Sequence, residues 1–155
     1  MHTPFSVRQD DPGRGEIAIL IRAHLAEMAQ HSPPQSIHAL SIEELRAPNV
    51  TFWSVWAGSA LAGCGALKEL DATHGEIKSM RTAAGYLRQG VASSLLEHLM
   101  AEARRRGYLR LSLETGSMAA YAAARRLYTQ FGFETCPPFA SYALDPNSIF
   151  MTRAL

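Results

Sequence analysis

The sequence predicts a single α/β domain spanning residues 1–155, in which a mixed sheet of six to seven strands carries about four helices on its two faces. Three observations predict this fold. Strand patterns dominate the first half and follow one another closely, as in an antiparallel meander. From residue 90 onward, helical and strand patterns alternate, which is typical of a sheet covered by helices. The chain has 155 residues, 47% of them hydrophobic, which suits one domain with its own core.

The N-terminal segment predicts a strand followed by a helix. Residues 5–9 alternate apolar and polar side chains, which indicates a strand, and a turn cluster follows at 10–13. Residues 16–30 repeat apolar side chains at helical spacing. Pro33 and Pro34 end this helix, because proline lacks the backbone donor and clashes with the preceding turn.

A short helix and three strands are expected next. Ser41, with Glu44 three residues later, has the pattern of a capping box and predicts a short helix. The strands are recognised by aromatic, β-branched or small apolar residues, with turns predicted at 58–59 and 71–75. They cover residues 50–57, 60–67 (with a bulge near its glycines) and 76–82.

The second half alternates helices and strands. Residues 90–106 form the strongest amphipathic pattern, and Gly107 is a left-handed stop for that helix. Three arginines at 104–106 fall in its last turn, where cations complement the helix dipole. A strand at 108–114 and a helix at 117–131 follow. Two last strands are predicted at 133–136 and 149–153.

The bulk properties exclude several classes of protein. A net charge of +1 gives no reason to expect nucleic acid or an anionic membrane as a partner. No stretch reaches the roughly 18 apolar residues of a membrane helix. The first seven residues do not have the pattern of a secretion signal. Cys64 and Cys136 fit free thiols in a reducing compartment, so a cytoplasmic location is expected.

Residues 86–93 are the most informative segment, because a glycine-containing turn lies between a strand and the strongest helix. Gly90 and Ala92 let the backbone approach a ligand closely. The free N–H groups of the first helical turn then favour an anion such as a pyrophosphate. An ordinary helix start explains the same residues if they are taken alone.

Three segments give the chain a resemblance to a known family. Residues 87–92 resemble the acyl-CoA signature of the GCN5-related N-acetyltransferases (GNAT), written Arg/Gln-x-x-Gly-x-Gly/Ala, although Leu87 departs from its first position. Residues 124–133 are similar to the family's Ala-x-x-Leu-Tyr-x-x-x-Gly-Phe segment, with Tyr121 where an asparagine is often found. Residues 75–82 look like the strand that pairs with the pantetheine arm of coenzyme A.

The resemblance implies an activity. A family member transfers an acetyl group from acetyl-CoA to a primary amine of a small molecule or amino acid-like acceptor, by direct attack in a ternary complex. It implies that Glu76 removes the amine proton, with Glu114 as a rival base, and that Tyr128 protonates the departing thiolate. Glu76 could instead be an exposed strand-end residue paired with Lys78, and Tyr128 a core aromatic. Strand alternation puts Glu76, Lys78, Met80 and Thr82 on one face.

The resemblance also implies binding residues. Those expected to bind acetyl-CoA are Met80, Arg81, Thr82, Arg88, Gln89, Gly90, Val91, Ala92, Ser93 and Tyr121. Those available for the acceptor are His24, Met28, Ser36, His38 and Trp53. A metal site is not expected, because the prolines at 33–34 prevent the regularly spaced histidines from sharing one helix.

Two other readings stay open. The departures at Leu87 and Tyr121 favour a non-catalytic acyl-CoA-binding or sensing module as the alternative function. A dinucleotide-binding domain ranks last, because its glycine turn should follow the first strand. The apolar end at 149–151 favours a homodimer.

Overall fold

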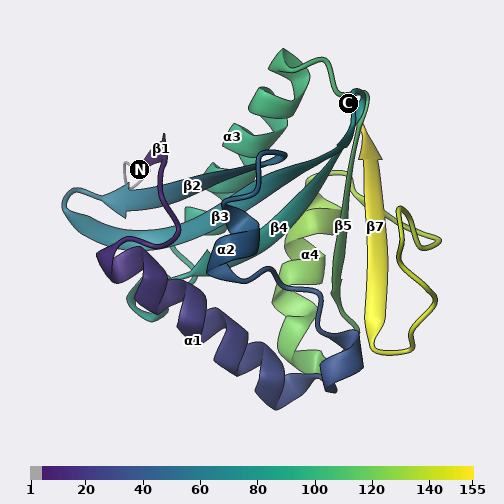
Figure 1. The fold of residues 1–155 in the computed structure, drawn as a ribbon, viewed down its shortest axis with the longest axis horizontal. Coiled ribbons are helices and arrows are strands. Elements are labelled where there is room, and N and C mark those ends of the chain that lie inside the picture. Colours follow the sequence, from purple (N-terminus) through teal and green to yellow (C-terminus); the bar gives the residue numbers. More distant parts are fainter. Residues whose placement is uncertain (1–4) are drawn as a thin grey trace.

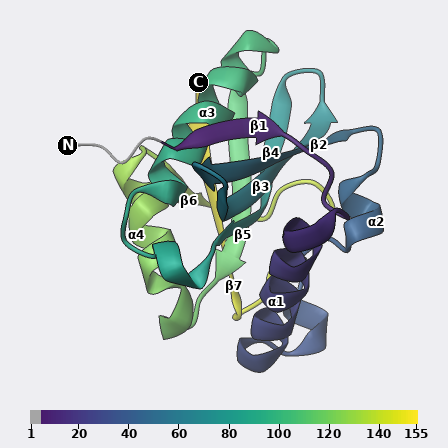
Figure 2. The ribbon, with the colours of Figure 1, turned by 90° about the vertical axis from the view of Figure 1, so that its left-hand side faces the viewer.

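The computed structural model describes residues 5–155, which form a seven-stranded mixed sheet with helices against both faces (Figures 1 and 2). The four residues before them, part of the segment expected not to be a secretion signal, lie outside the described residues. The strand order is β1-β2-β3-β4-β5-β7-β6, in which β4 and β5 are parallel and the other neighbouring pairs are antiparallel. This confirms the predicted α/β class with an antiparallel first half.

The elements follow the expected order. The strands are β1 (Ser6–Gln9), β2 (Val50–Ala57), β3 (Ala60–Asp71), β4 (His74–Thr82), β5 (Arg110–Gly116), β6 (Glu134–Cys136) and β7 (Ser148–Ala154). The helices are α1 (Gly15–His31), α2 (Ile42–Leu45), α3 (Val91–Arg105) and α4 (Ala122–Gln130), and 3-10 turns cover η1 (Pro34–Ser36), η2 (Ala84–Tyr86) and η3 (Ala119–Tyr121). None of the helices within residues 5–155 is long and apolar enough to cross a membrane.

Several predicted boundaries differ from the structure, among them those of the strand predicted at 108–114, which is β5 at Arg110–Gly116. The β3–β4 turn is tighter than the predicted 71–75, because the Asp71 carboxylate accepts the backbone N–H of Thr73 at 2.9 Å and closes the hairpin early. The helix predicted at 117–131 begins as the 3-10 turn η3 and becomes α-helical only at Ala122. Arg125 donates to the carbonyls of Gly116 and Met118, which holds this start against the end of β5.

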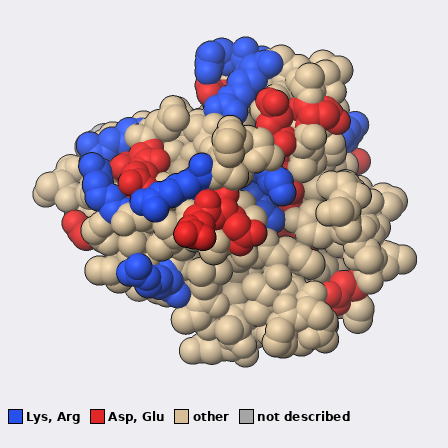
Figure 3. Space-filling model, viewed as in Figure 1, with Lys and Arg blue, Asp and Glu red and all other residues tan. Residues whose placement is uncertain are grey.

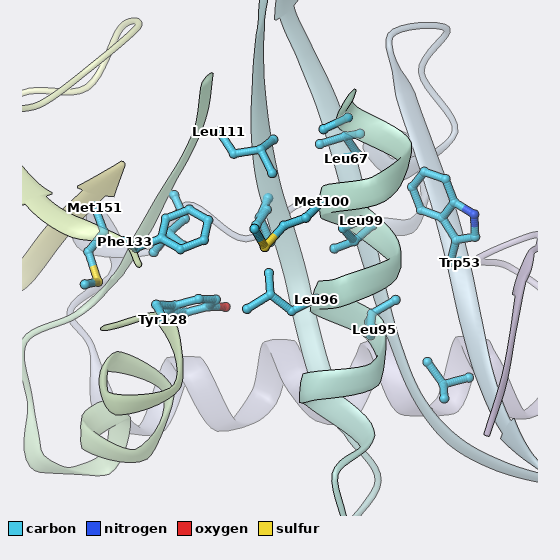
Figure 4. Packing of buried hydrophobic residues seen from close by; sticks show 14 of the residues in the cluster. Trp53, Leu67, Leu95, Leu96, Leu99, Met100, Leu111, Tyr128, Phe133 and Met151 are labelled. Atoms are coloured by element: carbon cyan, nitrogen blue, oxygen red, sulfur yellow. The ribbon is translucent and has the colours of Figure 1, made fainter. Parts of the chain in front are cut away.

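The sheet separates two apolar clusters. Helices α3 and α4 cover one face, where Trp53, Leu67 and Leu113 of the strands meet the leucines of α3, Tyr128 and Phe133 (Figure 4). Helices α1 and α2 cover the other face over Phe52, Trp56 and Cys64. Each helix thus buries its apolar stripe against one face of the sheet.

A bulge in β4 changes which way its side chains point. Between the pairs Cys64–Arg81 and Ala66–Lys78, Ser79 and Met80 of β4 stand opposite one residue of β3, and Ser79 has a φ of 55°. Met80 therefore packs against the α3 cluster, and Arg81 pairs with Glu27 of α1 on the opposite face. The predicted alternation, with Met80 on the face of Glu76, was wrong because the extra residue inverts it.

The charged side chains are mixed on the face seen in Figure 3, where basic and acidic groups adjoin one another instead of forming one large patch of a single sign. Examples are the pairs Arg14–Asp10, at 2.9 Å, and Arg46–Asp11, at 2.8 Å. This mixture is consistent with the net charge of +1.

Candidate active site

The two parallel strands at the centre of the sheet separate. Strands β4 and β5 pair at three positions, His74–Arg110, Gly75–Leu111 and Glu76–Ser112. Beyond these, β4 stays paired with β3 as far as Thr82, and β5 stays paired with β7 as far as Gly116. Each strand therefore offers backbone groups along the opening to another extended chain. The predicted contacts from Met80 and Thr82 to a pantetheine arm concern this part of β4.

The glycine turn lies between β4 and α3. Gly90 is the N-cap of α3 with a φ of 88°, and Arg88 is also left-handed, with a φ of 62°. No atom lies within 4 Å of the position that a Cβ on Gly90 would take, so its backbone angle, not crowding, requires glycine. The N–H groups of Val91, Ala92 and Ser93 belong to the first helical turn and have no acceptor within the helix. The binding of a phosphate by these groups stays a prediction.

Glu76 is buried and locked in a polar group with two partners. Its side chain is 2% exposed and that of Lys78 is 8% exposed, and their charged atoms are 3.4 Å apart. The hydroxyl of Tyr142 donates to the same Glu76 oxygen at 2.5 Å. Lys78 Nζ also donates to Tyr142 at 2.8 Å and to the carbonyl of His38 at 2.9 Å. The ammonium of Lys78 therefore makes two hydrogen bonds and one ion pair inside this group. The alternative interpretation of Glu76 was an exposed strand-end residue paired with Lys78. The pairing with Lys78 is present, but Glu76 is buried.

Tyr142 is the residue of this group that the sequence reasoning missed. It comes from the loop between β6 and β7, which the prolines at 137, 138 and 146 predict as a connection. Burial, together with the charge of Glu76, raises the pKa of Tyr142, so the phenol keeps its proton. A lone tyrosine among small loop residues gave no periodic signal that could have identified it.

Two loops are joined above Glu76. The hydroxyl of Ser36, in η1, donates to the carboxylate of Asp145 at 2.5 Å, and the side-chain amide of Asn147 donates to Ser36 at 3.3 Å. The His38 ring packs edge-on against Tyr142 with centroids 4.9 Å apart. Ser36 and His38, predicted for the acceptor, therefore lie beside the Glu76 group. The Ser36 side chain is used in joining the loops.

Glu114 is the second carboxyl group on this side of the sheet. It lies on β5 two residues beyond the last pair with β4, and alternation from Ser112 puts it on the face of Glu76. Burial raises the pKa of Glu114, whereas a hydrogen bond from Ser148 and the charges of His38 and Lys78 lower it in part. Among the described residues it has no ion-pair partner within 4.0 Å.

Tyr128 lies on the opposite face. It extends from α4 into the α3 cluster, its hydroxyl points toward Leu96, and its ring packs edge-on against Phe133 at 5.8 Å (Figure 4). Burial raises the pKa of Tyr128, so its phenol is protonated at physiological pH. The opening between β4 and β5 thus has Tyr128 on one face of the sheet and the carboxyl groups on the other.

The residues predicted on α1 are only partly brought together with the site. His24 lies near Arg81, and burial and that positive charge lower the pKa of His24 to about 4. Met28, one turn further along α1, is half-buried. Trp53 is separated from the acceptor residues, because it belongs to the α3 cluster and its ring meets His98 of α3 at 5.6 Å.

Unpartnered buried polar atoms gather at the opened end of the sheet. The four such side-chain atoms among the described residues are Ser79 Oγ, Arg81 Nε, Tyr121 OH and Ser148 Oγ. Ser79 and Arg81 are on the separated part of β4, and Ser148 begins β7. The ring of Tyr121 packs on Gly116 at the end of β5, where it leaves no room for a Cβ. A ligand with polar atoms at this end would satisfy such groups.

Metal ligands do not cluster in residues 5–155, where no three side chains of His, Cys, Asp or Glu are close enough to share an ion. Cys64 and Cys136 are both free thiols.

Comparison with known proteins connects this geometry to a family. Residues 18–133 match the family model described as Acetyltransferase (GNAT) family. An uncharacterized N-acetyltransferase of Bacillus subtilis, YsnE, is 58% identical over 96% of this chain and 99% of its own. A Klebsiella pneumoniae structure described as an acyl-CoA N-acyltransferase is 29% identical, with a TM-score of 0.80 over 99% of both chains. A structure of a GNAT acetyltransferase from Elizabethkingia anophelis with acetyl-CoA bound has a TM-score of 0.68 at 16% identity, over 97% of this chain and 98% of the other.

Proposed function

The chain belongs to the GNAT family of acetyltransferases, and from this premise we propose that it transfers an acetyl group from acetyl-CoA to the primary amine of a small or amino acid-like acceptor. The reaction we propose is direct attack by the amine while both substrates are bound. The observation that carries the proposal is the opening between β4 and β5, with the glycine turn near one end, carboxyl groups on one face and a protonated phenol on the other.

The residues of this chain fit acetyl-CoA. The first-turn amides of α3 and the Arg88 side chain suit a pyrophosphate, because they combine a positive dipole end with a cation. The separated edge of β4 suits the amide groups of a pantetheine arm. Bound acetyl-CoA supplies a thioester whose C–S bond breaks as the amine nitrogen forms a C–N bond. The protein has to orient the amine, remove its proton and supply a proton to the sulfur.

The proposed division of roles follows the two faces. Tyr128 keeps its proton at neutral pH, as a donor to a departing thiolate must. Glu76 and Glu114 lie on the other face, from which an amine can approach. Phe139 and Phe150, with ring centroids 6.0 Å apart, lie beside Tyr142 and provide an apolar wall for the rest of the acceptor.

The test is an assay for release of free thiol from acetyl-CoA with n-butylamine, tyramine, putrescine and glycine as acceptors. Turnover with at least one amine is expected, together with CoA binding in a calorimeter. CoA binding without turnover for any acceptor would instead favour the non-catalytic acyl-CoA-binding module.

Tyr128→Phe is expected to lower kcat roughly 100-fold, as loss of a general acid does, with the Kd for CoA unchanged. The matched control is Tyr108→Phe, because Tyr108 is a buried tyrosine of the same cluster whose hydroxyl donates to Glu69 at 2.6 Å. Equal kcat values for the two variants would contradict the acid role.

A further inference from the structure

We propose that Glu114, assisted by the hydroxyl of Ser148, is the group that binds the acceptor's ammonium and removes its proton, whereas Glu76 is a positioning residue held in a closed group with Lys78 and Tyr142. The inference rests on the proposed acetyl transfer and refines it. It assigns the two carboxyl groups different tasks from the contacts that each one makes.

Glu76 is held through one of its two carboxylate oxygens by a cation and a phenol of this chain. It is 2% exposed, and its Oε2 receives both the Tyr142 hydroxyl at 2.5 Å and the Lys78 ammonium at 3.4 Å. A carboxylate paired with a buried cation is neutralised by it, so protonating Glu76 would leave the Lys78 charge buried without compensation. The Lys78 ammonium thus already occupies a place beside Glu76 that an acceptor's ammonium would need.

Glu114 has the opposite properties. It is half-buried instead of enclosed, lies beyond the point where β5 leaves β4, and makes no ion pair within 4.0 Å among residues 5–155. Lys78 is paired with Glu76 and acts on Glu114 only from a distance, so Glu114 has no ion-pair partner of its own within residues 5–155. A primary ammonium of a ligand would provide the positive partner that the Glu114 carboxylate lacks.

Ser148 provides a second, independent observation. Ser148 is 7% exposed, and within residues 5–155 its Oγ makes no hydrogen bond of ideal geometry. It lies close enough to the Glu114 carboxyl that a hydrogen bond from it lowers the pKa of that group, against the effect of burial. Ser148 and Glu114 share one face of the β5–β7 ladder, since their partners are Gly116 and Phe150. A buried hydroxyl whose one neighbouring acceptor is a carboxyl without a counter-ion can orient that carboxyl and accept an N–H donor from a ligand.

The step is a simple proton transfer. An N–H bond of the ammonium breaks and the proton joins a Glu114 oxygen, so a charged pair becomes a neutral amine with a free electron pair and a neutral carboxylic acid. Burial raises the pKa of Glu114, which brings the carboxyl closer to the range in which a general base works best. Because the side chain is half-buried, the proton can return to solvent before the next turnover.

The groups that face Glu114 come from every neighbouring element. They are Glu76 and Lys78 of β4, His38 of the loop before α2, Tyr142 of the β6–β7 loop and Ser148 of β7. His38 is the histidine in this set, so its contribution is separated by a variant.

The experiment measures kcat/KM against pH, from 5 to 9.5, for the panel amine that the wild type acetylates best. Glu114→Gln is expected to lower kcat/KM about 100-fold near pH 7 and to remove the acidic limb of the profile. Its defect should shrink toward pH 9.5, where more of the amine is already neutral. Glu76→Gln and His38→Gln should keep the limb, and Ser148→Ala should raise KM for the amine more than it lowers kcat.

Folding and cofactor binding are controlled separately. Glu114→Gln should melt at or above the wild-type temperature, since it removes a partly buried charge, and should bind CoA with unchanged Kd. Glu134→Gln, an exposed glutamate on β6, serves as the matched surface control. A Glu114→Gln enzyme within threefold of wild type that retains the acidic limb would overturn the assignment. Wild-type protein without turnover for any amine would overturn the proposed function instead.

Discussion

At the scale of single residues, the group formed by Glu76, Lys78 and Tyr142 explains how two charges are tolerated inside the protein. A buried ion pair is sustained when additional hydrogen bonds satisfy the remaining donors and acceptors. Here the Tyr142 hydroxyl donates to Glu76 and accepts from Lys78. Lys78 also donates to the His38 carbonyl. The sequence identified Glu76 through the family resemblance, but it could not identify Tyr142, which is 66 residues away and reaches the site only because the β6–β7 loop folds back.

Tyr142→Phe is expected to lower the free energy of unfolding by about 1–3 kcal/mol, because Glu76 and Lys78 each lose a buried partner while the ring packing remains. Urea denaturation followed by circular dichroism measures this change. Leu144→Ala is the control in the same loop, since Leu144 is 86% exposed and its removal should leave stability unaltered. A Tyr142→Phe protein as stable as wild type would mean that the hydroxyl makes no net contribution to the free energy of unfolding.

Gly90→Ala is expected to cost about 1–2 kcal/mol of stability, because Gly90 has a φ of 88° that disfavours a Cβ. The matched control is Gly107→Ala at the other end of α3, where φ is 84° and the space around the Cβ position is equally open. Both variants should lose similar stability in a thermal melt. Only Gly90→Ala should weaken CoA binding in a calorimeter, and equal CoA affinities would argue against a phosphate at this turn.

At the scale of elements, the regular strands and helices were predictable, whereas irregular backbone was not. Residues 50–57 and 91–105 have periodic patterns, so local sequence predicts them well. The β4 bulge is different, because Ser79 has no glycine-like signature and its left-handed backbone follows from pairing with β3. Alternation along β4 therefore gave the wrong face for Met80. The early start expected for α4 failed for a similar reason, since Arg125 fixes η3 through contacts made only in the fold.

Ser36→Ala is expected to loosen the two loops that cover Glu76, because it removes the hydroxyl that donates to Asp145. Hydrogen exchange measured by mass spectrometry should be faster in residues 137–147, and KM for the amine should rise while the Kd for CoA is unchanged. Ser41→Ala is the matched control, since Ser41 caps α2 nearby and its loss should affect that helix alone. Unchanged exchange in residues 137–147 of Ser36→Ala would contradict the coupling of the loops.

At the scale of the whole molecule, stability should depend on the pH through His24. Its pKa is about 4 in the folded protein against 6.5 for an ordinary histidine, so the unfolded chain binds more protons between these values. This contribution is fully present above pH 6.5 and is lost as the pH falls toward 4. A shift of this size corresponds to up to about 3 kcal/mol.

His24→Gln should therefore flatten the dependence of the free energy of unfolding on pH between 4 and 6.5, as measured by urea titrations at several pH values. His31→Gln, which changes an exposed histidine at the end of the same helix, should keep the wild-type slope. If both variants followed the wild-type curve, the burial of a neutral His24 would not contribute to acid sensitivity.

The overall architecture was predictable because strand order along the chain and helix placement leave few arrangements. Strands that follow one another form hairpins, and the helix between β4 and β5 requires a parallel crossover. The sequence could not reveal how far β4 and β5 stay together, because this depends on twist and on the β4 bulge.

The short pairing of β4 with β5 has a mechanical meaning. The sheet has two parts, β1 to β4 and β5 to β7, which are joined by three residue pairs between β4 and β5. Each part keeps its own hydrogen bonds up to the line where β4 and β5 separate. A ligand that bonded to the free edges of both β4 and β5 would connect the two parts of the sheet, and its binding would reduce motion between strands that it does not contact.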